Sequence, residues 1–130
     1  MPHARLGLAT SAMLPAASRM RRSADFTAVL RTGQRAGART VVVHHRAELA
    51  VADVPLIGLV VGRNVGNSVV RHRVSRRLRA QLAARLTRLP SGSGTVVRAR
   101  PAAAPASSAE LGSDLDRCLA RLLDRAELRR

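Results

Sequence analysis

Residues 63–88 carry eight arginines and no acidic residue, and this stretch limits most strongly what the chain can fold into. Within it an aliphatic side chain recurs at every fourth position, the spacing that forms one stripe along an α-helix. A surface that serves only solubility mixes both signs of charge. We therefore interpret the stretch as a helix that packs along its stripe and binds a polyanion along its basic face; a solvated amphipathic helix is the alternative. The stripe is Val70, Val74, Leu78 and Leu82, and the other face carries His72, Arg76 and Arg79, with Arg73 and Arg77 beside them.

The charge of the whole chain points the same way. All 23 cationic residues are arginine, against eight acids, which gives a net charge of +15. Residues 1–109 carry the whole excess, because residues 110–130 hold five arginines and five acids. Such an excess favours nucleic acid as the partner. Arginine forks onto phosphate oxygens, although a GC-rich genome explains the absence of lysine equally well.

The composition also excludes several classes of protein. Phe26 is the only aromatic residue, so a folded core must be aliphatic. Leucine, valine, isoleucine and phenylalanine make up 33 of the 130 residues. That share lies above the roughly 20% below which disorder is expected, and the length fits one domain. No run of about 18 apolar residues is present to span a membrane. The single cysteine, Cys118, allows neither an intramolecular disulfide nor a cysteine zinc cluster, and we expect it in the core.

The remaining patterns predict an α+β domain with the element order α-β-β-β-α-β-α. We expect Ser23 to cap a first helix that Gly33 stops. Asn67 or Ser68 is expected to cap the long helix, which ends near Pro90. Strands are expected at 40–45, 56–61 and 95–100 with a short edge strand in 34–39, a linker at 101–108 and a last helix from 111 onward.

The domain itself is expected to span residues 19–125. We interpret residues 1–18 as a disordered extension, with a transit peptide or a true start at Met13 as alternatives. Residues 126–130 are interpreted as a basic tail.

The stretch from Gly62 to Arg79 resembles the signature of the bacterial ribonuclease P protein family, which is close to Lys-x-Gly-Asn-Ala-Val-x-Arg-Asn-Arg-x-Lys-Arg-x-x-Arg. Three positions depart from it: Asn64 replaces the first Lys, His72 replaces Asn, and Ser75 replaces Lys. Residues 13–15, 19–20 and 25–26 are similar to the start of the family, so the resemblance runs from about residue 13 to 124. The matching residues are Gly66, Asn67, Val69, Arg71, Arg73, Arg76 and Arg79, and Arg77 can return the charge lost at Ser75.

This resemblance implies a protein subunit of ribonuclease P, which assists the endonucleolytic removal of the 5′ leader from precursor tRNA in the cytoplasm. The catalyst would be the RNA subunit with Mg²⁺ held by RNA, so the protein would supply no catalytic residue and no metal ligand. Its partners would be the catalytic RNA subunit and precursor tRNA, with no membrane and no obligate protein partner. The implied fold has a left-handed β-α-β crossover through the arginine-rich helix, as in a domain of a small-subunit ribosomal protein, whereas general geometry predicts a right-handed one.

The resemblance also implies two binding surfaces. One would face the RNA subunit, and the other would be a cleft between the first helix and the central sheet that holds the single-stranded leader. Phe26 can stack on a base or pack in the core, and His44 can stack, donate to phosphate or be a half-buried strand residue. The first surface would comprise Arg63, Asn67, Arg71, His72, Arg73, Arg76, Arg77 and Arg79, and the cleft would comprise Phe26, Leu30, His44 and Val60.

The residues by themselves reveal no protein active site. No carboxylate pair lies near a histidine in the sequence, and no metal-ligand spacing is present. His44 and His45 are adjacent, so on a strand they point to opposite faces and cannot share a metal ion. Two other classes remain as alternatives: a ribosomal or ribosome-assembly protein, and a helix-turn-helix DNA-binding protein. The second is disfavoured because predicted strands precede the basic helix.

Overall fold

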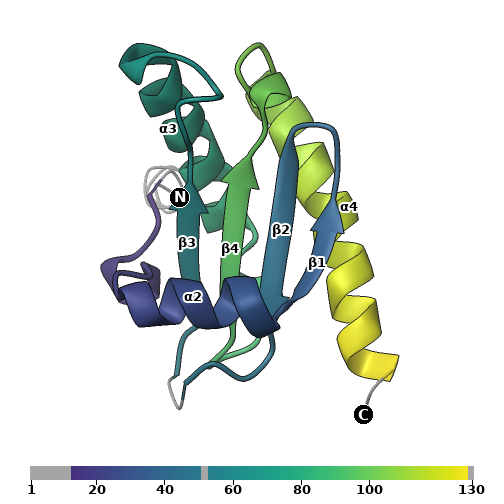
Figure 1. The fold of residues 1–130 in the computed structure, drawn as a ribbon. Helices are drawn as coiled ribbons and strands as arrows, with labels where there is room; N and C mark the ends of the chain where they lie inside the picture. Colours follow the sequence, from purple (N-terminus) through teal and green to yellow (C-terminus); the bar gives the residue numbers. More distant parts are fainter. Residues whose placement is uncertain (1–12, 51–52, 129–130) are drawn as a thin grey trace, which may run out of the picture.

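The centre of the fold is a four-stranded mixed sheet in the computed structural model, which describes residues 13–50 and 53–128. Its strands are β1 (Gln34–Gly37), β2 (Val41–Arg46), β3 (Leu56–Val60) and β4 (Gly94–Ala99). They lie in the order β1-β2-β4-β3 (Figure 1). β1 and β4 run antiparallel to β2, and β3 runs parallel to β4, which requires a crossover connection between these two strands.

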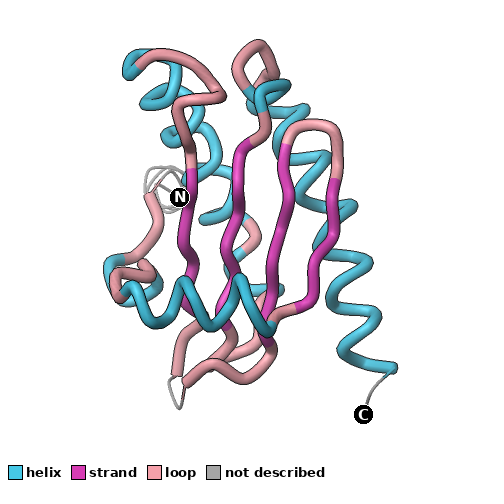
Figure 2. Tube along the Cα trace, in the orientation of Figure 1, coloured by secondary structure: helices cyan, strands magenta, loops and turns pink. Residues whose placement is uncertain are grey.

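Helices cover both faces of this sheet. Those of the described residues are α2 (Ser23–Thr32), α3 (Ser68–Ala84) and α4 (Ser108–Leu128), with short 3-10 turns η1 (Ala16–Ser18), η2 (Leu86–Arg88) and η3 (Pro101–Ala103). α2 crosses one face, whereas α3 and α4 pack together on the other (Figure 1, Figure 2). This order confirms the predicted α-β-β-β-α-β-α arrangement. Within the described residues, no helix is both long and apolar enough to cross a membrane.

The connection from β3 through α3 to β4 is left-handed. In Figure 1 both strands point upward, with β3 to the left of β4, and α2 lies in front of the sheet. The chain therefore leaves β3, passes behind the sheet in α3, and returns one position to the right. This is the hand that the family resemblance implies, and it is opposite to the hand of about 98% of such connections.

The alternation of side chains along the strands divides the core into two clusters. The larger cluster lies between the sheet and the α3–α4 layer, where Val43, Val97, Leu78 and Leu115 are fully buried. Cys118 belongs to this cluster and is fully buried, as expected. The smaller cluster lies under α2 and consists of Met20, Val29 and Val96, with Phe26, Leu49 and Leu56 packed against it.

Both ends of the domain differ from the boundaries predicted from sequence. Residues 13–18 were assigned to the disordered extension, but Leu14 is 4% exposed and Ser18 is 1% exposed, because η1 packs beside β3. Residues 1–12 lie outside the described residues. At the other end α4 continues through Leu128, so residues 126–128 belong to a helix rather than to a tail, and residues 129–130 are outside the described part.

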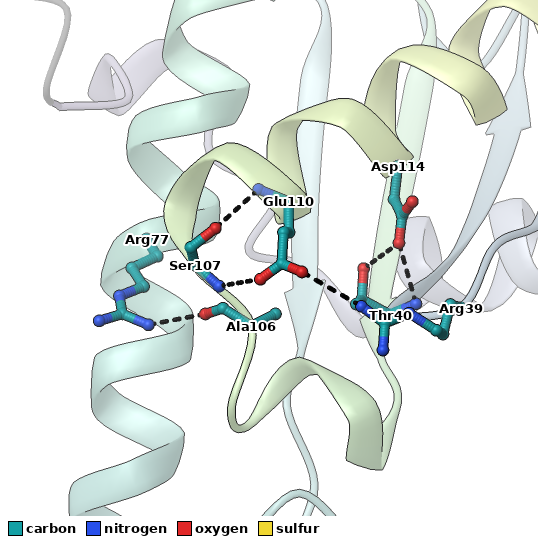
Figure 3. A network of polar contacts seen from close by, with 7 residues as sticks. All are labelled: Arg39, Thr40, Arg77, Ala106, Ser107, Glu110 and Asp114. Carbon is teal, nitrogen blue, oxygen red and sulfur yellow. Dashed lines mark hydrogen bonds and ion pairs between the residues drawn. The ribbon is translucent and has the colours of Figure 1, made fainter.

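The helix boundaries also need three corrections. Ser23 is the first residue of α2, whose N-cap is Arg22, so its hydroxyl does not cap the helix. α3 ends at Ala84 and not near Pro90, because the chain tightens into η2. α4 starts at Ser108, where a capping box closes the helix: Glu110 N donates to Ser107 Oγ at 3.1 Å and Ser107 N donates to Glu110 Oε1 at 2.8 Å (Figure 3).

Candidate nucleic-acid interface

The turn before α3 fixes where the arginine-rich helix begins. Gly66 has a φ of +157°, and a Cβ on it would lie 2.9 Å from Cβ of Val70, so no larger residue fits without a shift. Asn67 is the N-cap, and its side-chain oxygen accepts a hydrogen bond from Val70 N at 3.0 Å. This confirms the predicted cap at Asn67. The side-chain oxygen of Asn67 is therefore already hydrogen-bonded within the protein.

The predicted stripe of α3 is buried and its basic face is in solvent. Val74, Leu78 and Leu82 are fully buried against the sheet and α4, and Val70 is half-buried. The opposite face exposes His72, Arg76 and Arg79, and Arg63 is exposed in the turn before the helix. These four side chains form what we call the α3 basic face: Arg63, His72, Arg76 and Arg79.

Two arginines assigned to the same surface have partners inside the protein. Arg73 Nη2 donates to the carbonyl oxygen of Ala104 at 3.1 Å, and Arg77 Nη1 donates to that of Ala106 at 2.7 Å (Figure 3 shows the second bond). Both side chains are half-buried. They hold the segment between β4 and α4 against α3, a role that leaves less of each guanidinium for RNA. Arg71 is also half-buried.

The α2 side of the sheet presents two rows of side chains across all four strands. The backbone pairing places Arg35, His44, Val96 and Gly58 in one row. The next row contains Gly37, Val42, Arg98 and Val60. α2 covers the first row and leaves the second open, so this face is half closed by a helix and half available to a ligand.

Phe26 and Leu30, both on α2, differ in their surroundings. The ring of Phe26 is half-buried and packs against the smaller core cluster above Gly58. Leu30 is one turn further along the helix and is 37% exposed. The structure therefore places Phe26 largely in the core while Leu30 stays at the surface.

His44 lies under α2 and is 7% exposed. Burial lowers the pKa of its imidazole, and the positive charges of Arg98 and Arg35 lower that pKa further. Nε2 of His44 is buried without a hydrogen-bond partner. Burial and the two neighbouring cations therefore both disfavour the protonated form of His44, the form that would attract a phosphate.

The open row of the sheet floors a hollow of about 260 Å³. Val42 and Val60 supply apolar floor, and Arg98 and Arg100 supply charge at its β4 side. Gly62 and Asn64 close the other end, so the hollow runs directly into the turn that starts α3.

Comparison with known proteins decides the family. The family model described as Ribonuclease P matches residues 14–123. This chain belongs to the ribonuclease P protein family. The ribonuclease P protein component of Acidothermus cellulolyticus is 53% identical over 110 residues, covering 85% of this chain and 92% of the relative. That of a Nocardioides species is 49% identical over 111 residues, covering 85% and 95%.

Solved structures of ribonuclease P proteins share the fold. A mutant RNase P protein of Staphylococcus aureus superposes with a TM-score of 0.71 at 23% identity, covering 85% of this chain and 89% of that one. The RNase P protein of Thermotoga maritima gives a TM-score of 0.66 at 23% identity, covering 80% and 94%. The left-handed crossover therefore occurs within a fold already known for this family.

Three arginines on the α2 side of the sheet were not among the site residues predicted from sequence. Arg98 and Arg100 are exposed and lie two residues apart on and just after β4, and Arg35 occupies the row beside His44. Because side chains alternate along an extended strand, Arg98 and Arg100 lie on the same face as Val96. Arg35 lay in a strand too short for its pattern to indicate a face.

The described residues contain no group of three or more His, Cys, Asp or Glu side chains close enough to hold a metal ion. His44 and His45 do point to opposite faces, since Nδ1 of His45 is 2.9 Å from Thr95 Oγ1 on the α3–α4 side.

Proposed function

We propose that this chain is the protein subunit of a ribonuclease P that removes the 5′ leader of precursor tRNA in the bacterial cytoplasm. The observation that carries the proposal is the α3 basic face in a chain of this family: Arg63, His72, Arg76 and Arg79 are exposed in a stretch without one acidic residue. Guanidinium groups bind phosphate oxygens in two-point contacts, so this face suits the backbone of a structured RNA.

In this proposal the α3 basic face binds the catalytic RNA subunit and the open sheet face binds the leader. Val42 and Val60 supply apolar surface for bases, while Arg98 and Arg100 pair with leader phosphates. The hydrolysis is assigned to the RNA subunit with RNA-bound Mg²⁺. The protein assists because its arginines replace divalent ions in screening the repulsion between two RNAs.

Reconstitution tests the assignment. Cleavage of precursor tRNA by an RNase P RNA transcript is measured over a range of Mg²⁺ concentrations, with the protein, without it, and with the protein alone. We expect the protein to lower the Mg²⁺ requirement of the RNA and to cleave nothing by itself. Metal-dependent cleavage by the RNA-free protein, or recovery of ribosomal RNA as the main RNA bound in cells, would contradict the proposal.

The leader surface has its own test. Arg98→Ala should weaken binding of precursor tRNA by the assembled complex while leaving mature tRNA unaffected, because only the precursor carries a leader. Arg117→Ala is the matched control, since Arg117 is an exposed arginine on α4, on the opposite side of the sheet. Equal losses for precursor and mature tRNA in Arg98→Ala would rule out this placement of the leader.

A further inference from the structure

Val69 is the most exposed large hydrophobic residue among the described residues, at 71%. It lies in the first turn of α3, beside the α3 basic face. With Ser68, His72, Arg73 and Arg76 it lines an open hollow of about 540 Å³. An isolated exposed valine needs no explanation, but this one lies in a hollow whose other walls are a serine, an imidazole and two guanidinium groups.

The chemistry of these walls fits a nucleobase. Val69, His72 and Arg76 lie at i, i+3 and i+7, so they follow one another along the same side of the helix. An imidazole ring and a guanidinium plane are both surfaces on which unstacked bases of RNA stack. Valine adds apolar contact beside these two surfaces.

We propose that this hollow binds one unstacked nucleobase of an RNA, with His72 as the stacking surface, Val69 as the apolar floor and Arg76 on the adjoining phosphate. The proposal rests on the proposed function, because it adds base recognition to a face assigned so far to phosphates alone. It concerns a residue that departs from the family signature: His72 stands where the signature has Asn, whose amide has no aromatic ring. An apolar protein segment is disfavoured, because it would have to desolvate the guanidinium groups around the hollow without pairing them.

Two short RNA probes separate stacking from charge. Both have the same length and number of phosphates: one is a decaadenylate, and the other is a ten-residue RNA of abasic nucleotides. The wild-type protein should bind decaadenylate more tightly, and His72→Ala should reduce that preference about fivefold or more, which corresponds to the low end of one base–aromatic stacking contact. His72→Phe should restore the preference, because phenylalanine returns an aromatic face without a charge.

The matched control is Arg79→Ala, which removes an exposed cation of the α3 basic face outside the hollow. It should weaken the binding of both probes equally and flatten the salt dependence of binding, whereas His72→Phe should leave the preference for decaadenylate intact. His72 and Arg79 are exposed, so both variants should fold, which a thermal melt checks.

The outcomes separate this inference from the proposed function. An unchanged ratio of the two affinities in His72→Ala overturns the base site, even if the protein still stimulates precursor-tRNA cleavage. If the ratio falls in His72→Ala and recovers in His72→Phe, the base site stands. That result would hold even if the protein failed to stimulate the RNase P RNA transcript, which would overturn the proposed function alone.

Discussion

The ring of Phe26 lies directly over the backbone of Gly58, where a Cβ would come within 2.5 Å of the Cε1 atom of the ring. The only aromatic residue of the chain therefore packs on the sheet at a strand position that has no side chain beneath it. The missing side chain at Gly58 lets the ring lie against the backbone of β3. The same contact explains why Phe26 is less available to RNA than its position on α2 suggests.

Gly58→Ala should force Phe26 away from the sheet and destabilise the domain. The added methyl group also meets Cζ of Phe26 at 2.6 Å, and overpacking of this kind costs about 1–3 kcal/mol. Urea unfolding followed by circular dichroism measures the loss. Gly37→Ala is the matched control, because a Cβ there meets only the far end of Arg100 at 3.8 Å. Equal effects of the two substitutions would show that the contact with Phe26 does not constrain α2.

The arginines of α3 should separate into two groups. Arg77→Ala removes the hydrogen bond to Ala106, so it should lower the free energy of unfolding by about 1–2 kcal/mol. Arg76→Ala and Arg79→Ala should leave stability unchanged, since both side chains are in solvent. For RNA binding we expect the larger effects in Arg76→Ala and Arg79→Ala. Each exposed arginine lost should reduce the slope of log affinity against log salt concentration by about 0.7–0.9.

Urea unfolding and salt-dependent binding to an RNase P RNA transcript, measured on the same three variants, check both halves of this prediction. A change of salt slope in Arg77→Ala as large as that in Arg76→Ala would mean that Arg77 leaves Ala106 to contact RNA in the complex.

Sequence periodicity predicted the buried stripe of α3 but not the division among its arginines. The stripe follows from helical geometry alone, so Val74, Leu78 and Leu82 are where the spacing places them. Whether Arg77 faces solvent depends instead on where the segment ending at Ala106 passes. That path is set by tertiary packing, which one helical period does not encode.

The start of α4 is predictable from the sequence. Ser107 and Glu110 have the three-residue spacing of a capping box, and this signal lay in a stretch assigned to a linker because of its proline and alanine content. The packing of α4 on the β1–β2 hairpin is not predictable from the sequence. It depends on Asp114 and Thr40, which are 74 residues apart, and no local pattern joins them.

Asp114 should be the most sensitive polar residue of the described structure. Its carboxylate oxygen Oδ2 accepts from both Thr40 N at 3.1 Å and Thr40 Oγ1 at 2.5 Å, and both residues are buried (Figure 3). Asp114→Ala leaves the two donors of Thr40 unsatisfied, which should cost about 2–6 kcal/mol, because each buried unpaired group costs about 1–3 kcal/mol. Urea unfolding measures this loss.

Glu110→Gln is the comparison for Asp114→Ala. Glu110 lies one turn earlier on α4 and forms an exposed ion pair with Arg39 at 3.3 Å. Exposed ion pairs contribute about 0–1 kcal/mol, and glutamine can keep the capping box. We therefore expect little change in Glu110→Gln, and a loss there as large as that in Asp114→Ala would mean that the exposed ion pair holds α4 on the hairpin as strongly as the buried hydrogen bonds do.

Acid should destabilise the domain through its two buried strand histidines. The pKa of His44 is lowered from 6.5 by burial and by Arg98 and Arg35, and the pKa of His45 is lowered from 6.5 by burial. As pH falls below about 6.5, the unfolded chain takes up protons before the folded one does, so the free energy of unfolding falls. Each histidine can contribute a slope of at most about 1.4 kcal/mol per pH unit, and above the ordinary histidine pKa its contribution should be constant.

Urea unfolding at half-unit intervals from pH 5 to pH 8 measures this dependence. The double variant His44→Gln, His45→Gln should lose most of the slope between about pH 5 and 6.5, whatever its absolute stability. Carboxylates act in a separate window: the pKa values of Glu110 and Asp116 are lowered from 4.5 and 3.8, by hydrogen bonds from Ser107 and from Arg85 respectively. Their stabilisation is lost only as pH falls further, so it should remain in the double variant. A wild-type slope that persists unchanged in that variant between pH 5 and 6.5 would mean that both imidazoles are protonated in the folded protein as readily as in the unfolded chain.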